Sequence, residues 1–279
     1  MEKIVVPVDF SDISAYGSSL AVKVAAHLQA ELHFIHVVPL PSHVLLTPEG
    51  ELFEDGDFDT SIPKKQKEVA GVQMKSWVEK YYPSAVSCVC YGHVNEDVIK
   101  YADKHKASLI VMGTHAVSGV KELLANSHSE YIAMHSHIPL MTLKCDRSDM
   151  EVKKIVLAGS FKDDDVPHCE MALAIQKAFK AQLYLLRVNT ANNFLADGEA
   201  YKHMRAFAEK HKLEDVEFAV YSDNDVEEGI MHFVAKNNID IIAIGSKQRK
   251  GLNKIINGCV SADLLNHVYK PILTFKLKD

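Results

Sequence analysis

The sequence lacks long apolar runs, and none approaches the ~20 residues that a membrane-spanning helix needs. It is also short of basic residues, with 31 Lys and Arg against 37 Asp and Glu, which disfavours a nucleic-acid partner. The first apolar stretch begins at Lys3, so we expect no signal peptide. The five cysteines are an odd number without zinc-ligand spacing, which is typical of free thiols in a reducing compartment. These absences predict a cytoplasmic protein with no membrane and no nucleic acid as partner.

Common catalytic signatures are missing as well. The sequence contains no P-loop, no nucleophile elbow and no dehydrogenase glycine fingerprint. His128, His135 and His137 stand close together, but no cysteine or carboxylate accompanies them at a recognised ligand spacing. Cys88 and Cys90 alternate along an apolar run, so a disulfide between them would have poor geometry. We therefore expect no metal site, and we identify no catalytic residue.

What the sequence does contain is an internal repeat. The segment KIVVPVDFSD from Lys3 aligns with KIVLAGSFKD from Lys154, at an offset of 151 residues. Further along, Gly113 aligns with Gly245 and the offset has fallen to 132. The first half therefore carries about 19 additional residues, which fall within residues 39–63. This segment has four prolines, six acidic residues and no Lys or Arg, a composition that predicts a loop.

Each half alternates apolar runs of strand length with amphipathic segments of helix length. The helical segments have apolar residues three and four positions apart, as at Met74 and Trp77. This alternation predicts an α/β protein whose parallel sheets are covered by helices on both faces. We expect two tandem doubly wound domains of five parallel strands each, residues 1–146 and 152–279, with a polar boundary at 145–152. The predicted strands are residues 3–8, 31–38, 86–92, 108–113 and 139–144, then 154–159, 182–188, 216–222, 239–245 and 271–276.

The ends of the predicted strands indicate where a ligand would bind. An open parallel sheet binds ligands beyond the carboxyl ends of its strands, where the strand order reverses. The residues that leave the first and fourth strands are Asp9 and Gly113 in one half, and Ser160 and Gly245 in the other. A glycine at such a point lets the backbone turn sharply and approach a ligand closely.

Ser127 begins the helical segment that follows the fourth strand of the first half. Its spacing from Glu130 is that of a capping box, which predicts a helix cap. Free N–H groups at the start of a helix also attract phosphate. The two roles are compatible, and the sequence leaves both open.

Two tandem copies of this pattern, with VPVDFSD near the start and VMGTHAVSG after the fourth strand, resemble the universal stress proteins. The resemblance spans nearly the whole chain and implies an adenine nucleotide alpha hydrolase-like fold. Nucleotide-binding members carry the pattern G-x2-G-x9-G-[S/T] after the fourth strand, and an aspartate that ends the first strand contacts the nucleoside. The resemblance implies a nucleotide site in the first half at Pro7, Val8, Asp9, Val37, Met112, Gly113, His115, Ala116, Gly119, Asn126 and Ser127. In the second half it implies a weaker site at Gly245, Gly258 and Cys259.

The chain departs from this pattern in both halves. Ala116 and Asn126 replace two glycines of the first half, although asparagine is well suited to a left-handed turn. In the second half Gln248 replaces a glycine and Ser160 replaces the aspartate. Cys259 replaces a hydroxyl with a weaker hydrogen-bond donor. The resemblance therefore implies a degraded ATP site in the first half, with Mg if ATP binds, and a degenerate second half.

The function that the resemblance implies is a cytoplasmic stress-response binding protein, and we expect at best weak ATP hydrolysis. The alternatives are an interaction scaffold that binds no nucleotide and a slow ATPase. Domains of this family commonly pair through their last strands, so we expect residues 139–144 and 271–276 to pair within one chain as a pseudo-dimer. The sequence leaves open whether two chains also form a homodimer and which protein partner the chain binds. The acidic insertion follows the second strand, and it is either a lid over the pocket or a solvated loop.

Overall fold

The computed structural model describes residues 1–41, 44–53, 59–114, 128–161, 169–246 and 269–276. Its strands are β1 (Lys3–Pro7), β2 (Glu31–Pro39), β3 (Val86–Gly92), β4 (Leu109–Gly113), β5 (Leu140–Leu143), β6 (Lys154–Ala158), β7 (Gln182–Asn189), β8 (Val216–Ser222), β9 (Ile241–Ser246) and β10 (Ile272–Lys276). Its helices are α1 (Asp12–Leu28), α2 (Ser61–Tyr81), α3 (Val94–Lys104), α4 (His128–His135), α5 (Glu170–Phe179), α6 (Asp197–Lys210) and α7 (Val226–Asn237). The helix expected between β9 and β10 lies outside the described residues.

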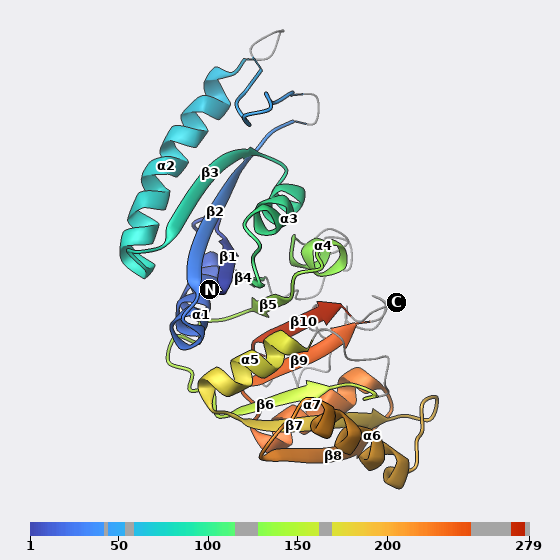
Figure 1. Ribbon diagram of the computed structural model, residues 1–279. Helices are drawn as coiled ribbons and strands as arrows, with labels where there is room; N and C mark the ends of the chain where they lie inside the picture. The colour runs from blue at the N-terminus through green and yellow to red at the C-terminus, as the bar shows by residue number, and fades with distance from the viewer. Residues whose placement is uncertain (42–43, 54–58, 115–127, 162–168, 247–268, 277–279) are drawn as a thin grey trace.

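The strands form one sheet of order β3-β2-β1-β4-β5-β10-β9-β6-β7-β8, which runs through both halves (Figure 1). Within each half the paired strands are parallel. β1 lies between β2 and β4, and β6 lies between β7 and β9, so the order reverses beside the first strand of each half. This topology confirms the predicted α/β class with a doubly wound arrangement in each half.

The two halves meet where β5 and β10 pair antiparallel. Met141 lies opposite Leu273, and neither side chain is exposed. The Thr274 hydroxyl donates a hydrogen bond to the carbonyl of Leu140 at 3.3 Å. Each last strand thereby covers an edge that would otherwise be open. The predicted pairing of the last strands within one chain is thus present.

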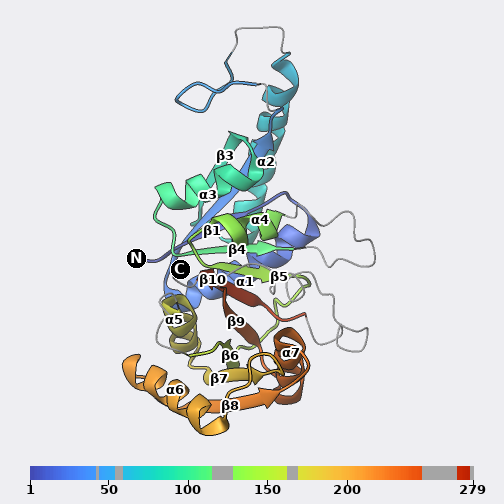
Figure 2. The same cartoon turned by 90° about the vertical axis from the view of Figure 1, so that its right-hand side faces the viewer.

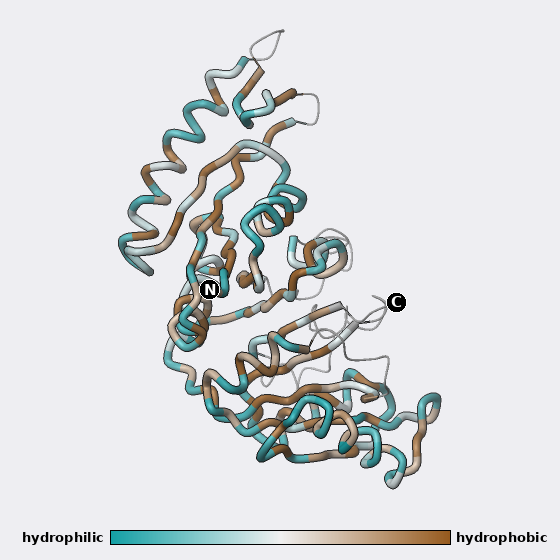
Figure 3. Tube along the Cα trace, in the orientation of Figure 1, coloured by the Kyte–Doolittle hydropathy of each residue, from teal (hydrophilic) through white to brown (hydrophobic). Residues whose placement is uncertain are grey.

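Helices cover both faces of the sheet, with α2 and α3 on opposite sides of β2 and β3 in Figure 1, and Figure 2 looks onto the side that carries α3 and α4. On the face of α1, α2, α5 and α6 one apolar core runs through both halves, while the opposite face has a separate core in each half. The apolar strands that build these cores appear brown in Figure 3. α1 and α5 meet across the junction, where the rings of His27 and Phe179 stack with centroids 3.9 Å apart. The continuous apolar sequences of the strands predicted this buried sheet, because a strand covered on both faces has no polar side.

The insertion differs from the expected loop. β2 ends at Pro39 and α2 already begins at Ser61, so residues 61–63 belong to the helix. Between them Leu46 and Leu52 form an isolated antiparallel bridge, and Leu52 is buried in a cluster that includes Tyr91. Residues 44–53 are therefore held in part by apolar packing.

Helix α2 is 21 residues long and buries only Pro63, Ala70 and Met74. Its exposed face includes Ile62 at 62% exposure and Val72 at 69%. This helix is amphipathic only in part, because apolar residues are also exposed to solvent. Among the described residues, no helix combines the length and the apolar character that crossing a membrane would require.

Candidate functional site

The carboxyl ends of β1 and β4 lie side by side at the reversal point of the first half. Val5 is opposite Ile110, so both strands point the same way and end at the same edge of the sheet. The chain leaves β1 toward Asp9 and leaves β4 at Gly113. The structure therefore brings together the two residues that the strand ends singled out.

The apolar residues of the predicted site divide between the two faces of the sheet. Val37 and Met112 are buried in the core beneath α3 and α4. Val8 is buried in the opposite core, beneath α1 and α2. Pro7 is half-buried at the last position of β1. Val37 and Met112 thus share a face, whereas the side chain of Val8 does not join them.

Asp9 is held in place by two serines at the start of α1. Its Oδ1 accepts hydrogen bonds from the Ser11 hydroxyl at 2.5 Å and from the Ser11 amide at 3.0 Å. The Ser14 hydroxyl also donates to this oxygen, and it accepts from the Asp9 amide at 2.9 Å. Ser11 is the N-cap of α1, because its hydroxyl accepts from the Ser14 amide. The cap and the carboxylate therefore form one network that fixes the carboxylate at the edge of the sheet.

This network changes the acidity of Asp9. Partial burial alone would raise the pKa of the carboxyl group, because burial disfavours the charged form. Hydrogen bonds from Ser11 and Ser14 favour the charged form and outweigh burial, so the pKa is lowered. Asp9 is thus an exposed, ionised and oriented acceptor. The sequence predicted Asp9, but Ser14 was missed; its position three residues after an N-cap serine was the available signal.

Gly113 has a structural reason to be glycine. A Cβ atom at this position would overlap the carbonyl oxygen of Ile13 on α1. The close approach of α1 to the end of β4 therefore requires a residue without a side chain. A ligand-binding role for Gly113 stays a prediction, since helix packing accounts for the glycine.

Two buried hydroxyl groups connect β4 to α4. The side chains of Thr114 and Ser129 hydrogen-bond at 2.9 Å, and both residues are buried. α4 begins at His128, one residue after the predicted cap at Ser127. The predicted site residues that lie outside the described part of the chain are His115, Ala116, Gly119, Asn126, Ser127, Gly258 and Cys259.

The corresponding edge of the second half has different chemistry. Gly245 lies opposite Phe275 near the end of β9, and Ser160 follows β6 where Asp9 follows β1. The nearby end of β7 carries Arg187, which is only 7% exposed. Its Nε donates to the Asn189 side chain at 3.2 Å, and its Nη2 donates to a loop carbonyl at 2.8 Å. Burial lowers the pKa of this guanidinium. The second half thus lacks the oriented carboxylate of the first at this position.

An aromatic cluster beside Asp9 was not predicted. Phe10 adopts a left-handed backbone conformation, with φ of 65°, and its ring stacks on His36 with centroids 4.6 Å apart. Trp77 contacts Phe10 edge-on at 5.7 Å and donates its indole N–H to Ser18 at 3.0 Å. The Nδ1 of His36 also hydrogen-bonds the Val8 carbonyl at 2.8 Å. Sequence spacing alone does not show these contacts, because they join three separate elements.

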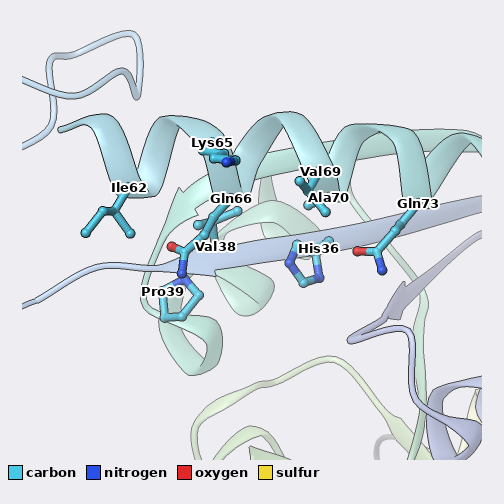
Figure 4. Close-up of a pocket in the computed structure, with 9 residues that line it drawn as sticks. All are labelled: His36, Val38, Pro39, Ile62, Lys65, Gln66, Val69, Ala70 and Gln73. Atoms are coloured by element: carbon cyan, nitrogen blue, oxygen red, sulfur yellow. The ribbon is translucent and has the colours of Figure 1, made fainter.

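A groove lies between β2 and α2, as Figure 4 shows. Its volume is about 410 Å³, which lies within the range of ligand pockets, roughly 300–1,000 Å³. His36 and Val38 line it from the strand, while Ile62, Val69 and Gln73 line it from the helix. Successive strand residues point to opposite faces, so this groove and the buried Val37 side chain lie on different faces of the sheet.

Comparison with known proteins identifies the family. The model of the universal stress protein family matches residues 1–144 and 151–276. Universal stress protein MJ0531 of Methanocaldococcus jannaschii is 29% identical over 143 residues, which cover 51% of this chain and 82% of that protein. Universal stress protein YxiE of Bacillus subtilis is 27% identical over 156 residues, which cover 51% of this chain and 98% of that protein.

Similarity to a solved structure extends over both halves. A universal stress protein from Archaeoglobus fulgidus aligns with a TM-score of 0.71 and 18% identity, covering 98% of each chain. At this identity the likeness shows a shared fold. The tandem arrangement is therefore common to both chains.

Proposed function

We propose that this chain, which belongs to the universal stress protein family, is a stress-response binding protein of the cytoplasm with one weakened nucleotide site. The site lies in the first half, at the reversal point between β1 and β4, and its ligand is ATP with Mg. The two domains span residues 1–146 and 152–279. Their pairing through β5 and β10 takes the place of a dimer of separate chains.

The observation that carries this proposal is the orientation of Asp9. The carboxylate is ionised, its Oδ1 is fixed by Ser11 and Ser14, and it stands at the sheet edge where ligands of such folds bind. A fixed carboxylate accepts hydrogen bonds from hydroxyl groups such as those of a ribose. We assign it to the nucleoside and the segment after β4 to the phosphates. Ala116 and Asn126 in that segment reduce the affinity.

We assign no nucleotide to the second half. Ser160 takes the place of Asp9, and Gln248 and Cys259 replace a glycine and a hydroxyl. The buried Arg187 uses its hydrogen bonds to hold the β7–α6 loop. We propose that this half stabilises the first through the shared sheet and core.

A protein-binding role is the second candidate, and the exposed side of α2 favours it. Ile62, Val69 and Val72 are more than half exposed on this helix, beside the groove that contains His36. Exposed apolar residues gathered on one element are typical of interaction surfaces. In this alternative the protein acts as a scaffold, and the crevice at Asp9 has no nucleotide.

The two candidates are separated by looking for bound nucleotide. The purified protein is heat-precipitated, and the supernatant is analysed by absorbance and mass spectrometry. We expect an adenine nucleotide to be released, and we expect Mg-ATP at millimolar concentration to raise the melting temperature. Ala116→Gly should bind ATP more tightly than the natural sequence. A clean supernatant together with no thermal shift would support the scaffold.

A further inference from the structure

Cys88 and Cys90 place two thiols on one face of an edge strand. Alternation along β3 puts both side chains on the same side of the sheet, where they border the core beneath α3. Cys88 is opposite Ile35 and Cys90 is opposite Val37. β3 is the first strand of the sheet order and has a neighbouring strand on one side only (Figure 1). The Cys90 thiol donates a hydrogen bond to the backbone carbonyl of His36 on β2, with the sulfur and oxygen atoms 3.9 Å apart. Both thiols are free and half-buried, so a small ion can reach them.

A disulfide is a poor way for this pair to bond. Residues two apart on a strand have Cα atoms about 6.6–6.8 Å apart, at the upper limit of about 6.8 Å for disulfides. Closing the bond would therefore strain the strand between the two residues. A third atom placed between the sulfurs requires no such movement, because each sulfur then bonds to the inserted atom.

We propose that Cys88 and Cys90 form a binding site for a soft, thiophilic metal ion of the Cu(I) class, held between the two sulfur atoms. Thiolate ligands select soft ions such as Cu(I). The described residues contain no group of three or more His, Cys, Asp or Glu side chains placed to hold a metal. Structural zinc sites need four ligands, whereas Cu(I) binds stably to two thiolates. The two sulfur ligands of the described residues therefore match the two-coordinate preference of Cu(I).

The charges around the pair are compatible with this ion. Binding replaces the protons of the two thiols with one Cu⁺, so protons leave to solvent, the bound unit carries one negative charge, and no atom changes oxidation state. Lys67 and Lys104 contribute positive charge near Cys88, while Asp97 contributes negative charge near Cys90. Binding tightens as pH rises, because the thiols must lose their protons. The site uses no residue assigned to the nucleotide, so it stands or falls independently of the proposed function.

The test uses full-length protein under anaerobic conditions. Cu(I) is added as its acetonitrile complex and competed with a chromophoric Cu(I) chelator, and native mass spectrometry counts the bound ions. The starting variant carries Cys145→Ser, Cys169→Ala and Cys259→Ser, so that only the pair remains. We expect this variant to bind one Cu(I). Adding Cys88→Ser or Cys90→Ser should weaken binding at least ~100-fold, since the loss of an outer-shell partner alone costs about 10–100-fold.

The controls separate the pair from single thiols and from misfolding. The same serine substitutions are also made singly in the natural sequence, where the melting temperature reports folding and the isosteric change should leave it nearly unaltered. Cys145→Ser alone should not change the affinity for Cu(I). The proposal fails if the pair-only variant folds and takes up no copper, or if either single serine variant of the pair binds copper as tightly as its parent.

Discussion

Gly17 of α1 and Gly113 of β4 are in backbone contact. A Cβ atom added to Gly17 would lie 2.5 Å from the amide nitrogen of Gly113, and one added to Gly113 would overlap the carbonyl of Ile13. Helix and strand thus approach each other at two glycines, close to the strand ends that carry the candidate site. This contact sets the position of the start of α1, and with it the serines that hold Asp9.

Gly113→Ala should destabilise the protein. The added methyl group has no space beside the backbone of α1, so we expect a loss of at least about 1–3 kcal/mol of unfolding free energy. Gly71→Ala is the matched control, because no atom lies within 4 Å of its Cβ position in the described structure. In the middle of a helix that change should stabilise by about 0.5–1 kcal/mol. Urea unfolding measures both, and equal effects from the two alanines would contradict the packing role of Gly113.

Arg187→Ala should also lower the free energy of unfolding, although Arg187 belongs to no ion pair in the described structure. Its removal takes one of two donors from the Asn189 Oδ1, which also accepts from the Leu195 amide, and takes the Arg187 donor from the Asn193 carbonyl. A hydrogen bond that involves a charged group contributes about 1.5–3 kcal/mol. Arg205 on α6 is exposed, and Arg205→Ala should stay within about 0.5 kcal/mol of the natural protein. Hydrogen exchange in residues 190–196 checks the mechanism, since only Arg187→Ala should increase it.

The sequence predicted the fold more completely than the site. Apolar strand runs and the internal repeat predicted two parallel halves, and the family resemblance implied that they pair through their last strands. The contact between Phe10, His36 and Trp77 depends on three elements meeting in space, which spacing does not reveal. Gly113 was correctly placed at the strand end, but the backbone of α1 gives it a second reason that only the structure shows.

The insertion shows a second kind of contact that the sequence did not predict. Its prolines and acidic residues predicted a loop, and the described residues 44–53 contain an isolated bridge between Leu46 and Leu52. Composition did not predict the burial of Leu52. This leucine is buried in one cluster with Tyr91 and forms the isolated bridge with Leu46. Single apolar residues in a polar segment carry no periodic signal, so their burial had to come from the structure.

Asp9→Asn should remove a contribution to stability that depends on pH. The folded-state pKa of Asp9 is lowered, so its ionised form stabilises the protein above the unfolded-state pKa of about 3.9. That contribution is lost as pH falls through the folded-state pKa. The natural protein should therefore exceed the asparagine variant in unfolding free energy at pH 6, and this difference should shrink as the pH falls below the unfolded-state pKa of about 3.9. A gap that stays constant with pH would show that Ser11 and Ser14 do not favour the charged carboxylate.

The junction between the halves should be sensitive to proline. Thr274 lies in β10 between β5 and β9, and proline there removes a ladder donor from an interior strand, at a cost of about 3 kcal/mol or more. Thr274→Val loses only the hydroxyl bond to Leu140, which we expect to cost about 1 kcal/mol. Calorimetry should then resolve separate transitions for the two halves in the proline variant alone. An unchanged single transition would mean that this pairing does not couple the halves.

The most direct measurement of the central claim is isothermal titration calorimetry of the full-length protein with Mg-ATP. We predict one site per chain. Asp9→Ala should weaken it by at least about tenfold, because a hydrogen bond to a charged group contributes about 1.5–3 kcal/mol. Ser160→Ala, at the corresponding position of the second half, should leave the affinity unchanged. Two equivalent sites, no detectable binding, or equal affinity with Asp9→Ala would contradict a single site organised by Asp9.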